Sequence, residues 1–365
     1  MNAIPPIRLV SQQLSGTGMQ TPKEVVSWMG AMQAQDYAMA KWGVGIRFSG
    51  STDNIVEEAF NHGEILRTHV LRPTWHLVAP ENIRWMLSLS ADKIKASARS
   101  RDRDLEITEE LYSQVNGIIH KSLEGNNHLT REAVGEALQK AGIAVDTSRM
   151  IHFMMRAEVE GIVCSGALQG KSHTYALLDE RVPPTKPLHK EEALAKLAQL
   201  YFTSHCPATL QDFVWWSGLS QTEAKKGLEA VKSGFVAEEM NGGTYWIAEP
   251  FKNVPSVDTS VYLLPAFDEY IISYRDRKAV LPSENQSKAV SSNGIFRPTI
   301  VANGQVIGLW KKSNTKNEPV RLTFFEPSPV FTNNEINQTI YAFGAFLDFS
   351  SGCFQVGKEV CKYEV

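Results

Sequence analysis

The sequence predicts an α+β protein. Two observations predict this class. A pattern of two amphipathic helices followed by two short strands recurs through the first 255 residues, and from about Val257 short β-rich runs replace it. Helix, turn, helix and a two-stranded wing make a winged-helix unit, whose second helix commonly enters the major groove of DNA. The expected domains are winged helix 1 with a connecting helix at 1–105, winged helix 2 at 106–184, winged helix 3 at 185–255 and a small β-barrel-like domain with a terminal helix at 256–365.

Bulk composition agrees with several soluble domains. The 365 residues exceed what one hydrophobic core usually serves. The net charge of -3 argues against a broadly basic nucleic-acid scavenger, although it leaves room for a local basic face. No stretch approaches the roughly 18 apolar residues of a membrane helix, and the N-terminus has no secretory pattern. We therefore expect a cytoplasmic protein without a membrane partner.

The cysteines and cofactor motifs exclude several classes. Cys164, Cys206, Cys353 and Cys361 are scattered and form no C-x-x-C pair. In a chain of this length they indicate free thiols in a reducing compartment. No metal-ligand spacing, P-loop or G-x-G-x-x-G motif occurs, so the sequence predicts no metal and no common cofactor.

The first unit begins with helical patterns and ends in a wing. Its expected elements are helices at 21–34, 36–48 and 51–63 and two strands within 64–80 around Arg72-Pro73. Connecting helices are expected after it, at roughly 81–100 and 108–123. Ser51 or Thr52 is the expected N-cap of the third helix, because their hydroxyls can accept the free N–H groups of a first turn.

The second and third units repeat this order. The second has helices at 129–142, with a threonine cap, and 146–163, with an aspartate or threonine cap, before two strands within 162–180. The third has helices at 208–219 and 220–234, and the latter begins with the capping box Ser220–Glu223. Its hairpin turns at Asn241-Gly242, a strong hairpin signal.

The C-terminal part is β-rich. Apolar runs at 260–274, 297–312 and 318–327 predict strands, and Asn303-Gly304 predicts a hairpin turn. A final helix is expected at roughly 333–349. The pattern indicates a small β-barrel or a curled sheet and not a fourth winged helix.

Several strings resemble a known family. They are "AMQAQDYAMAKWGVGIR", "LRTHVLRPTWHLVAPENIRWM", "LQDFVWWSGLS", "LLPAFDEYIISYRDR" and "RPTIVANGQVIGLWKK". In this order, from about residue 7 to 360, the chain resembles the AlkZ-like winged-helix DNA-binding proteins, which include DNA glycosylases that act on bulky or crosslinking alkylation damage. The resemblance implies three tandem winged helices and a β-barrel, C-shaped overall around a channel about as wide as duplex DNA. It also implies a glutamine–apolar–glutamine active-site motif, which falls on Gln33-Ala34-Gln35.

Two neutral glutamines make chemical sense for one substrate class. An N7-alkylated purine already carries positive charge, so its glycosidic bond is weakened before the enzyme acts. A glutamine carbonyl dipole can face the developing sugar cation, and the amide can orient water. A relative with a carboxylate at the second polar position of the motif would be expected to excise differently. Here that position is Gln35, which favours the crosslink-type branch.

The geometry of this motif leaves alternatives open. Residues i and i+2 on one helix point about 200° apart, so both glutamines reach one lesion only if the helix ends between them or one supports the other. Alternatively, Gln33 or Gln35 caps a helix or ties two winged helices together. Asp36 is expected to cap the next helix, although it could instead hold the water. Tyr37 is core or stacks on a base.

Basic residues suggest where DNA binds. His69 and His76 lie on facing strands of the first wing, where they line the pocket or are structural. The candidate DNA-binding residues are Arg67, His69, Arg72, His76, Lys93, Lys95, Arg99, Arg275, Arg277 and Arg297. The run containing Lys93, Lys95 and Arg99 contacts phosphates or is a solvated helix face. The last three flank predicted loops and a hairpin that could enter the minor groove.

Acidic and aromatic residues in the motifs have simpler interpretations. Asp268, Glu269 and Asp276 look catalytic by type, but we favour buried ion partners that hold the barrel to the winged helices. The tryptophans expected in the core are Trp42, Trp215 and Trp216.

These observations predict a monofunctional DNA glycosylase. It would hydrolyse the N-glycosidic bond of N7-alkylated, bulky or interstrand-crosslinked purines in double-stranded DNA, with Gln33 and Gln35 as catalytic residues. The motif has no lysine to form a Schiff base, so no lyase step is expected. A clamp that wraps DNA can work as a monomer, the state we expect. The alternative is a non-catalytic winged-helix regulator or damage binder, favoured by the acidic pI and the lack of an ionisable catalytic centre. A third possibility is a scaffold that binds protein.

Overall fold

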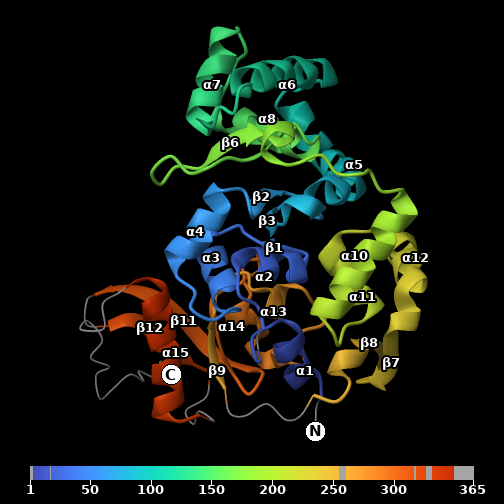
Figure 1. Ribbon diagram of the computed structural model, residues 1–365, viewed down its shortest axis with the longest axis vertical. Helices are drawn as coiled ribbons and strands as arrows, with labels where there is room; N and C mark the ends of the chain where they lie inside the picture. Colours follow the sequence, from blue (N-terminus) through green and yellow to red (C-terminus); the bar gives the residue numbers. More distant parts are fainter. Residues whose placement is uncertain (1–2, 17, 255–259, 316–317, 326–330, 349–365) are drawn as a thin grey trace.

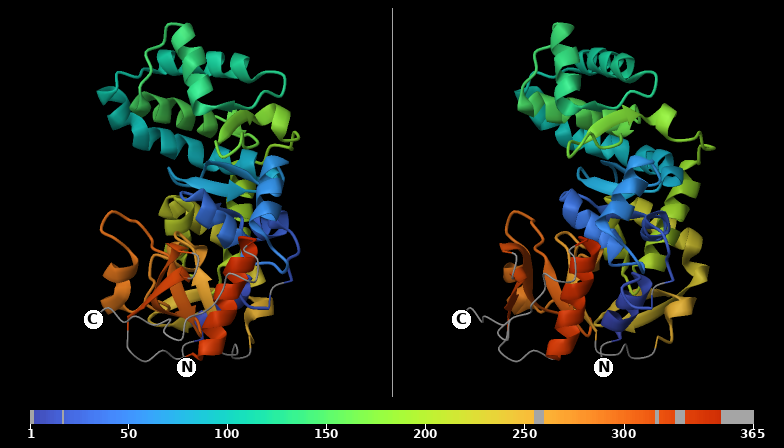
Figure 2. Two further views of the ribbon diagram at one scale, coloured as in Figure 1. Left: turned by 90° about the vertical axis from the view of Figure 1, so that its left-hand side faces the viewer. Right: turned by 60° about the vertical axis from the view of Figure 1, so that its left-hand side comes forward.

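The computed structural model describes residues 3–16, 18–254, 260–315, 318–325 and 331–348. Helices α6 to α8 lie at one end of the long axis, and a four-stranded sheet with helix α15 lies at the other (Figure 1). The N-terminal helices and strands lie between them, beside α10 to α12. In both views of Figure 2 the ribbon outline is indented at the level of β2 and β3.

The N-terminal part differs from prediction at one decisive point. Its elements are α1 (Ile4–Ser11), α2 (Pro22–Met29), β1 (Ala31–Gln33), α3 (Tyr37–Gly45), α4 (Asp53–Asn61), β2 (Leu66–His69) and β3 (Trp75–Val78). The helix predicted through residue 34 ends at Met29, because Gly30 adopts a φ of 76° and turns the chain into strand β1. The three strands form a sheet in the order β1-β3-β2. Thr52 is the N-cap of α4.

The next part carries its own hydrophobic core. Its elements are α5 (Pro80–Asp104), α6 (Glu109–Leu123), β4 (Leu129–Thr130), α7 (Arg131–Lys140), α8 (Thr147–Val159), β5 (Val163–Ser165), β6 (Thr174–Leu177) and α9 (Leu178–Arg181). The strands pair in the order β4-β6-β5. The predicted caps are confirmed, as Thr130 and Asp146 accept backbone N–H groups at the starts of α7 and α8. Buried side chains of α6, α7 and α8 pack together in a separate cluster.

The third segment follows the predicted order of two helices and a hairpin. Its elements are α10 (Lys190–Ser204), α11 (Leu210–Ser217), α12 (Gln221–Val231), η1 (Lys232–Gly234), β7 (Phe235–Met240), β8 (Gly243–Ala248) and η2 (Glu249–Phe251). The capping box of Ser220 and Glu223 is confirmed. The hairpin turns at Asn241 and Gly242, whose φ angles are 50° and 79°.

The C-terminal part is an open sheet. Its elements are β9 (Val261–Leu264), α13 (Glu269–Ile272), η3 (Ser283–Asn285), α14 (Gln286–Ala289), β10 (Thr299–Ala302), β11 (Gln305–Thr315), β12 (Glu318–Phe324) and α15 (Asn333–Phe346). The strand order is β12-β11-β10-β9, and within the described residues the two outer strands do not pair, so the sheet is open and, of the two alternatives, the β-barrel is wrong. The apolar side of α15 packs on this sheet, with Phe343 against Trp310, and stabilises the open form. The Asn303-Gly304 turn is confirmed. The predicted final helix ends at Phe346, and residue 349 lies outside the described residues.

A buried ion pair joins the C-terminal part to the N-terminal helices. The Arg47 guanidinium donates to both carboxylate oxygens of Asp268, at 2.9 and 2.8 Å. Both side chains are at most 1% exposed. The prediction of a buried ion partner is therefore confirmed for Asp268. It is wrong for Asp276, which is exposed and accepts the backbone N–H of Lys278 at 2.9 Å.

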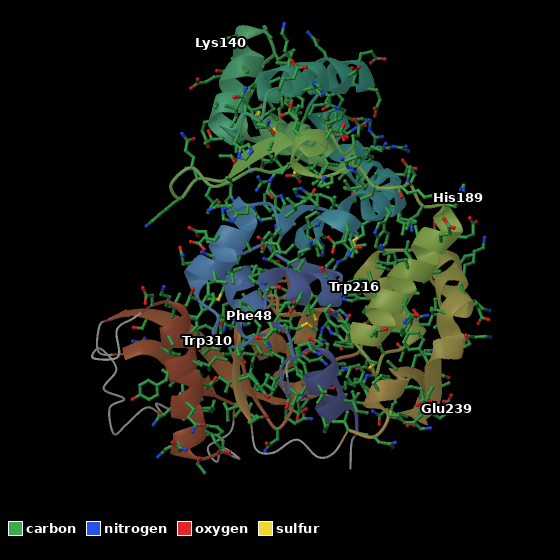
Figure 3. All side chains as sticks on the ribbon, in the orientation of Figure 1. Phe48, Lys140, His189, Trp216, Glu239 and Trp310 are labelled. Atoms are coloured by element: carbon green, nitrogen blue, oxygen red, sulfur yellow. The ribbon has the colours of Figure 1, made fainter. Side chains whose placement is uncertain are left out.

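The tryptophans divide between core and surface. Trp42 and Trp216 are buried, as predicted. In Figure 3 Trp216, a residue of α11, lies where this helix faces the N-terminal part. Trp215 is 41% exposed, so its predicted core position is wrong. Neighbouring residues on a helix point about 100° apart, so only one of this pair faces the core. The Trp215 ring is instead fixed at the surface by its Nε1–H, which donates to the Ile272 carbonyl at 2.7 Å.

Two further expectations concern thiols and membranes. Cys164 and Cys206 are buried free thiols, as predicted, whereas Cys353 and Cys361 lie outside the described residues. None of the helices in the described residues is long and apolar enough to span a bilayer.

Candidate functional site

The glutamine pair lies on and just after strand β1. Gln33 pairs with His76 of β3. The ladder continues past the end of β1, because the Ala34 N–H donates to the Trp75 carbonyl at 2.7 Å. Strand β1 ends at Gln33 and Gln35 lies in the bend before α3, so the two glutamines lie where β1 leads into α3 and not on one helix. The difficulty that a helix would have posed does not arise.

Gln33 is held at its backbone and at its side chain. Its N–H donates to Oε1 of Glu269 at 2.6 Å. Its side-chain Oε1 accepts from Nη2 of Arg72 at 3.0 Å. The residue is only 8% exposed, so few other orientations are open to it. Burial lowers the pKa of Arg72, which the negative charge of Glu269 partly offsets.

Gln35 is exposed beside the same segment of chain. Its Oε1 accepts the backbone N–H of Trp75 at 3.2 Å. Both glutamine carbonyls therefore contact the segment from Arg72 to Trp75, between β2 and the start of β3. Among the described residues, the side-chain hydrogen bonds of both glutamines are made by Oε1, and their Nε2 groups make none. Each amide can donate two hydrogen bonds, and each carbonyl keeps a second lone pair.

A buried carboxylate lies directly behind Gln33. Besides the Gln33 N–H, Glu269 accepts from Nε1 of Trp216 at 3.2 Å and from the Ser273 hydroxyl. Nε2 of His205 lies 3.7 Å away. Burial would raise the pKa of Glu269, but the nearby His205 ring and the hydrogen bonds from Ser273 and the Gln33 N–H outweigh it and hold the pKa at about 2. The carboxylate is therefore ionised at neutral pH.

Arg67 and His69 support the motif from strand β2. The Arg67 Nε–H donates to the Ala34 carbonyl at 3.0 Å, and its guanidinium lies 4.2 Å from the centre of the Trp75 ring. Burial lowers the pKa of Arg67. The His69 ring bonds Glu158 of α8, which also accepts the His69 N–H at 3.1 Å. These contacts tie the glutamine segment to the first sheet and to α8.

His76 presents an unusual buried nitrogen. Its Nδ1–H donates to the Thr74 carbonyl at 2.9 Å. Burial lowers its pKa to about 3, so the ring is neutral. Its Nε2 and the Thr68 hydroxyl on the neighbouring strand are buried, and neither has a partner in the described part of the chain. The row Gln33, His76 and Thr68 crosses the sheet on one face.

The basic run on α5 is partly used within the molecule. Lys93 donates to Glu223 at 2.6 Å and to the Gly218 carbonyl at 3.3 Å, which ties α5 to α12. Lys95 lies 3.4 Å from Asp92 and 4.0 Å from Glu160. Arg99 is exposed.

The C-terminal arginines differ in exposure. Arg275 is exposed and donates to the Gln211 side chain at 3.1 Å. Arg277 donates to the Ile271 carbonyl at 3.0 Å, lies over the Trp215 ring at 5.2 Å, and burial lowers its pKa to about 10. Arg275 and Arg277 help line a surface depression of about 270 Å³. Arg297 is exposed.

The residues after the motif begin the next helix. Oδ1 of Asp36 accepts the Met39 N–H at 3.1 Å, so the predicted N-cap of α3 is confirmed. The Tyr37 ring packs on Phe60 and His173, with ring centres 5.0 and 4.7 Å away. Tyr37 therefore packs inside the protein, between α4 and the segment just before β6, as expected.

The chain matches a known class of protein over most of its length. The profile of the family "DNA glycosylase AlkZ-like" matches residues 26–346, most of the chain. The chain belongs to this family, whose members are DNA glycosylases, a class of hydrolases that act on DNA. The family resemblance read from the sequence is confirmed.

Two comparisons identify particular relatives. The chain is 23% identical over 328 residues to the "Interstrand DNA cross-link repair glycosylase" of Streptomyces sahachiroi, covering 83% of this chain and 85% of that protein. The structure of Streptomyces sahachiroi DNA glycosylase AlkZ is similar with a TM-score of 0.82 at 19% identity, over 94% of this chain and 96% of that chain. The structural likeness shows a shared fold.

Proposed function

We propose that this protein is a monofunctional DNA glycosylase that hydrolyses the N-glycosidic bond of N7-alkylated, bulky or interstrand-crosslinked purines in double-stranded DNA. Family membership supports the reaction class. The crosslink substrate is supported by the relative from Streptomyces sahachiroi, which is described as a crosslink repair glycosylase. A glutamine at position 35 points to the same substrate.

One observation carries the proposal. Gln33 and Gln35 lie two residues apart where β1 leads into α3, and both carbonyl oxygens contact the segment from Arg72 to Trp75. Their Nε2 groups remain available as donors. Two amides that contact the same short segment can hold one water between them, because each supplies both a donor and an acceptor.

The chemistry needs no strong acid. The bond between C1′ and the purine nitrogen breaks, and its electron pair neutralises the cationic base that departs. A sugar cation develops, which the carbonyl dipoles of Gln33 and Gln35 stabilise in a site that excludes bulk water. The oriented water forms the new C1′–O bond and loses its proton to solvent, leaving an abasic site. A neutral purine is spared, since its base is a poor leaving group without protonation.

The architecture supports the same use. We take the three helix–helix–hairpin segments as tandem winged helices and the molecule as a C-shaped clamp on duplex DNA, working as a monomer in the cytoplasm. In this proposal Arg99, Arg275 and Arg297 contact phosphates, because they are exposed. The remaining candidates hold the site or neighbouring helices in place; they are Arg67, His69, Arg72, His76, Lys93, Lys95 and Arg277.

An unhooking assay tests the substrate class. A duplex with one N7-linked interstrand crosslink is incubated with the protein and resolved on a denaturing gel. Strand separation that leaves an alkali-sensitive site on one strand supports the proposal. Tight binding to the duplex without strand separation, and without base release from a monoadduct, would instead favour a non-catalytic DNA-binding protein.

A further inference from the structure

The buried carboxylate of Glu269 has no role in the chemistry described so far. It is 1% exposed and accepts three hydrogen bonds, from a backbone amide, an indole and a hydroxyl. Burying an ionised carboxylate is costly unless its lone pairs are satisfied. A fold that retains such a group one hydrogen bond from a catalytic residue invites a functional explanation.

We propose that Glu269 is the positioning residue of the glutamine site, fixing the backbone of Gln33 through a charge-assisted hydrogen bond. This inference rests on the proposed function and names a further residue for it. Glu269 begins helix α13, and 236 positions separate it from Gln33.

The hydrogen bond from the Gln33 backbone to Glu269 is short and charge-assisted. The Gln33 N–H meets Oε1 of Glu269 at 2.6 Å, shorter than most amide hydrogen bonds. Hydrogen bonds to ionised acceptors are about twice as strong as neutral ones. In β1, this residue's N–H is therefore held by the carboxylate while its neighbours pair with β3. The bond fixes the height and direction of the strand at its first glutamine.

The charge of Glu269 also acts on Arg72, which bonds the Gln33 side chain. The Arg72 guanidinium is partly buried, and its Nε has no hydrogen-bond partner in the described residues. Burial disfavours its charged form, and the charge of Glu269 favours it. Arg72 is the group that orients the Gln33 carbonyl, at 3.0 Å. Glu269 therefore holds Gln33 at the backbone, and its charge favours the charged form of the arginine that bonds the Gln33 side chain.

Glu269 is itself surrounded by side chains from three elements of the chain. Trp216 comes from α11, His205 follows α10, and Ser273 follows α13. His205 stacks on Tyr201 with ring centres 4.9 Å apart, so its position is set by the core. The neighbouring Asp268 is committed to Arg47 and cannot replace Glu269. The third segment and the C-terminal part together thus hold the carboxylate that bonds strand β1.

Glu269→Gln tests the inference, because it keeps the size of the side chain and one carbonyl acceptor but removes the charge. The matched control is Asp102→Asn on α5, another buried carboxylate, which accepts from Tyr112 at 2.7 Å and from His152 at 2.6 Å and lies outside the glutamine site. Single-turnover release of 7-methylguanine from duplex DNA is measured for wild type and both variants, with the DNA dissociation constant and the melting temperature on the same samples.

Glu269→Gln should slow base release by roughly 10- to 100-fold while the dissociation constant stays within about twofold, the pattern of a lost orienting partner. Asp102→Asn should lower the melting temperature without slowing release. A second readout is the backbone amide proton of Gln33 by NMR, which should lie far downfield in wild type and in Asp102→Asn, and move upfield in Glu269→Gln.

The outcomes separate the two proposals. Equal rates for Glu269→Gln and wild type, or losses of rate and binding in the same proportion, would overturn the role of Glu269 and leave the glycosylase proposal standing. A wild-type protein that releases no base would refute the proposed function. In that case an unshifted Gln33 amide in Glu269→Gln would overturn the positioning contact as well, and a shifted one would support it.

Discussion

The buried pair of Arg47 and Asp268 makes a quantitative prediction for stability. Substituting Asp268→Ala leaves a guanidinium that is 0% exposed without its carboxylate. Breaking a buried pair on one side typically costs about 3–5 kcal/mol, because the remaining charge is uncompensated. Arg47 keeps bonds to the Gly43 carbonyl at 2.6 Å and the Gln12 carbonyl at 3.0 Å, which places the expected loss near the lower end.

The corresponding fall in melting temperature follows from the size of the chain. With an unfolding entropy of about 2.1 cal/mol/K per residue, a loss of about 3 kcal/mol lowers the melting temperature of this chain by about 4 °C. The assay is differential scanning calorimetry of wild type, Asp268→Ala, Arg47→Met and the double variant Arg47→Met/Asp268→Ala. The double variant should lie closer to wild type than Asp268→Ala, since neither charge is then left unpaired.

Two results would refute this reasoning. If Asp268→Ala melts within about 1 °C of wild type, the pair does not hold the C-terminal part to α3 in the way the geometry indicates. If the two single substitutions add in the double variant, the side chains do not interact energetically, because additivity is expected only of independent sites.

Three further predictions concern protonation, charge and the turn before the motif. Burial lowers the pKa of His76 to about 3 from an ordinary 6.5, so between these pH values the unfolded chain binds one more proton than the folded protein. The free energy of unfolding therefore falls as pH drops through this window, by roughly 1.4 kcal/mol per pH unit. His76→Phe should reduce that slope in denaturant titrations between pH 4 and 6, and an unchanged slope would argue against a buried neutral ring. Arg99→Gln should weaken duplex binding and lower the slope of the logarithm of the DNA association constant against the logarithm of salt concentration by about 1. Lys93→Gln breaks the contact with Glu223 and should mainly lower thermal stability. Equal salt slopes for Arg99→Gln and wild type would exclude a phosphate contact. Gly30→Ala should destabilise by about 1–3 kcal/mol because the φ of 76° is strained for alanine, and a melt unchanged from wild type would contradict that turn.

Local features of this fold could be predicted from the sequence. Thr130, Asp146 and Ser220 cap the helices that follow them, because a cap depends only on residues two or three positions away. The Asn-Gly turns at 241 and 303 follow from residues that tolerate positive φ. These signals recovered the repeated order of helices and hairpins.

Non-local features could not be predicted. Strand β1 has only three residues and follows an apolar helical pattern, and it exists because it pairs with Trp75–Val78 more than 40 positions away. The open C-terminal sheet depends on α15 packing over it, which no strand pattern reveals. The contact between Gln33 and Glu269 is likewise set by tertiary packing. For the site, the sequence and its family resemblance named Gln33 and Gln35, while the partners that hold them needed the structure.

The central claim is that two neutral glutamines carry out base excision. The most direct measurement is release of free base from a duplex with one site-specific N7-methylguanine, by wild type, Gln33→Ala and Gln35→Ala, with DNA binding measured on the same samples. The account predicts free 7-methylguanine and an alkali-labile site with wild type, and loss of both in each variant while binding is retained. Tight binding by wild type without release of base, or undiminished release by both variants, would contradict it.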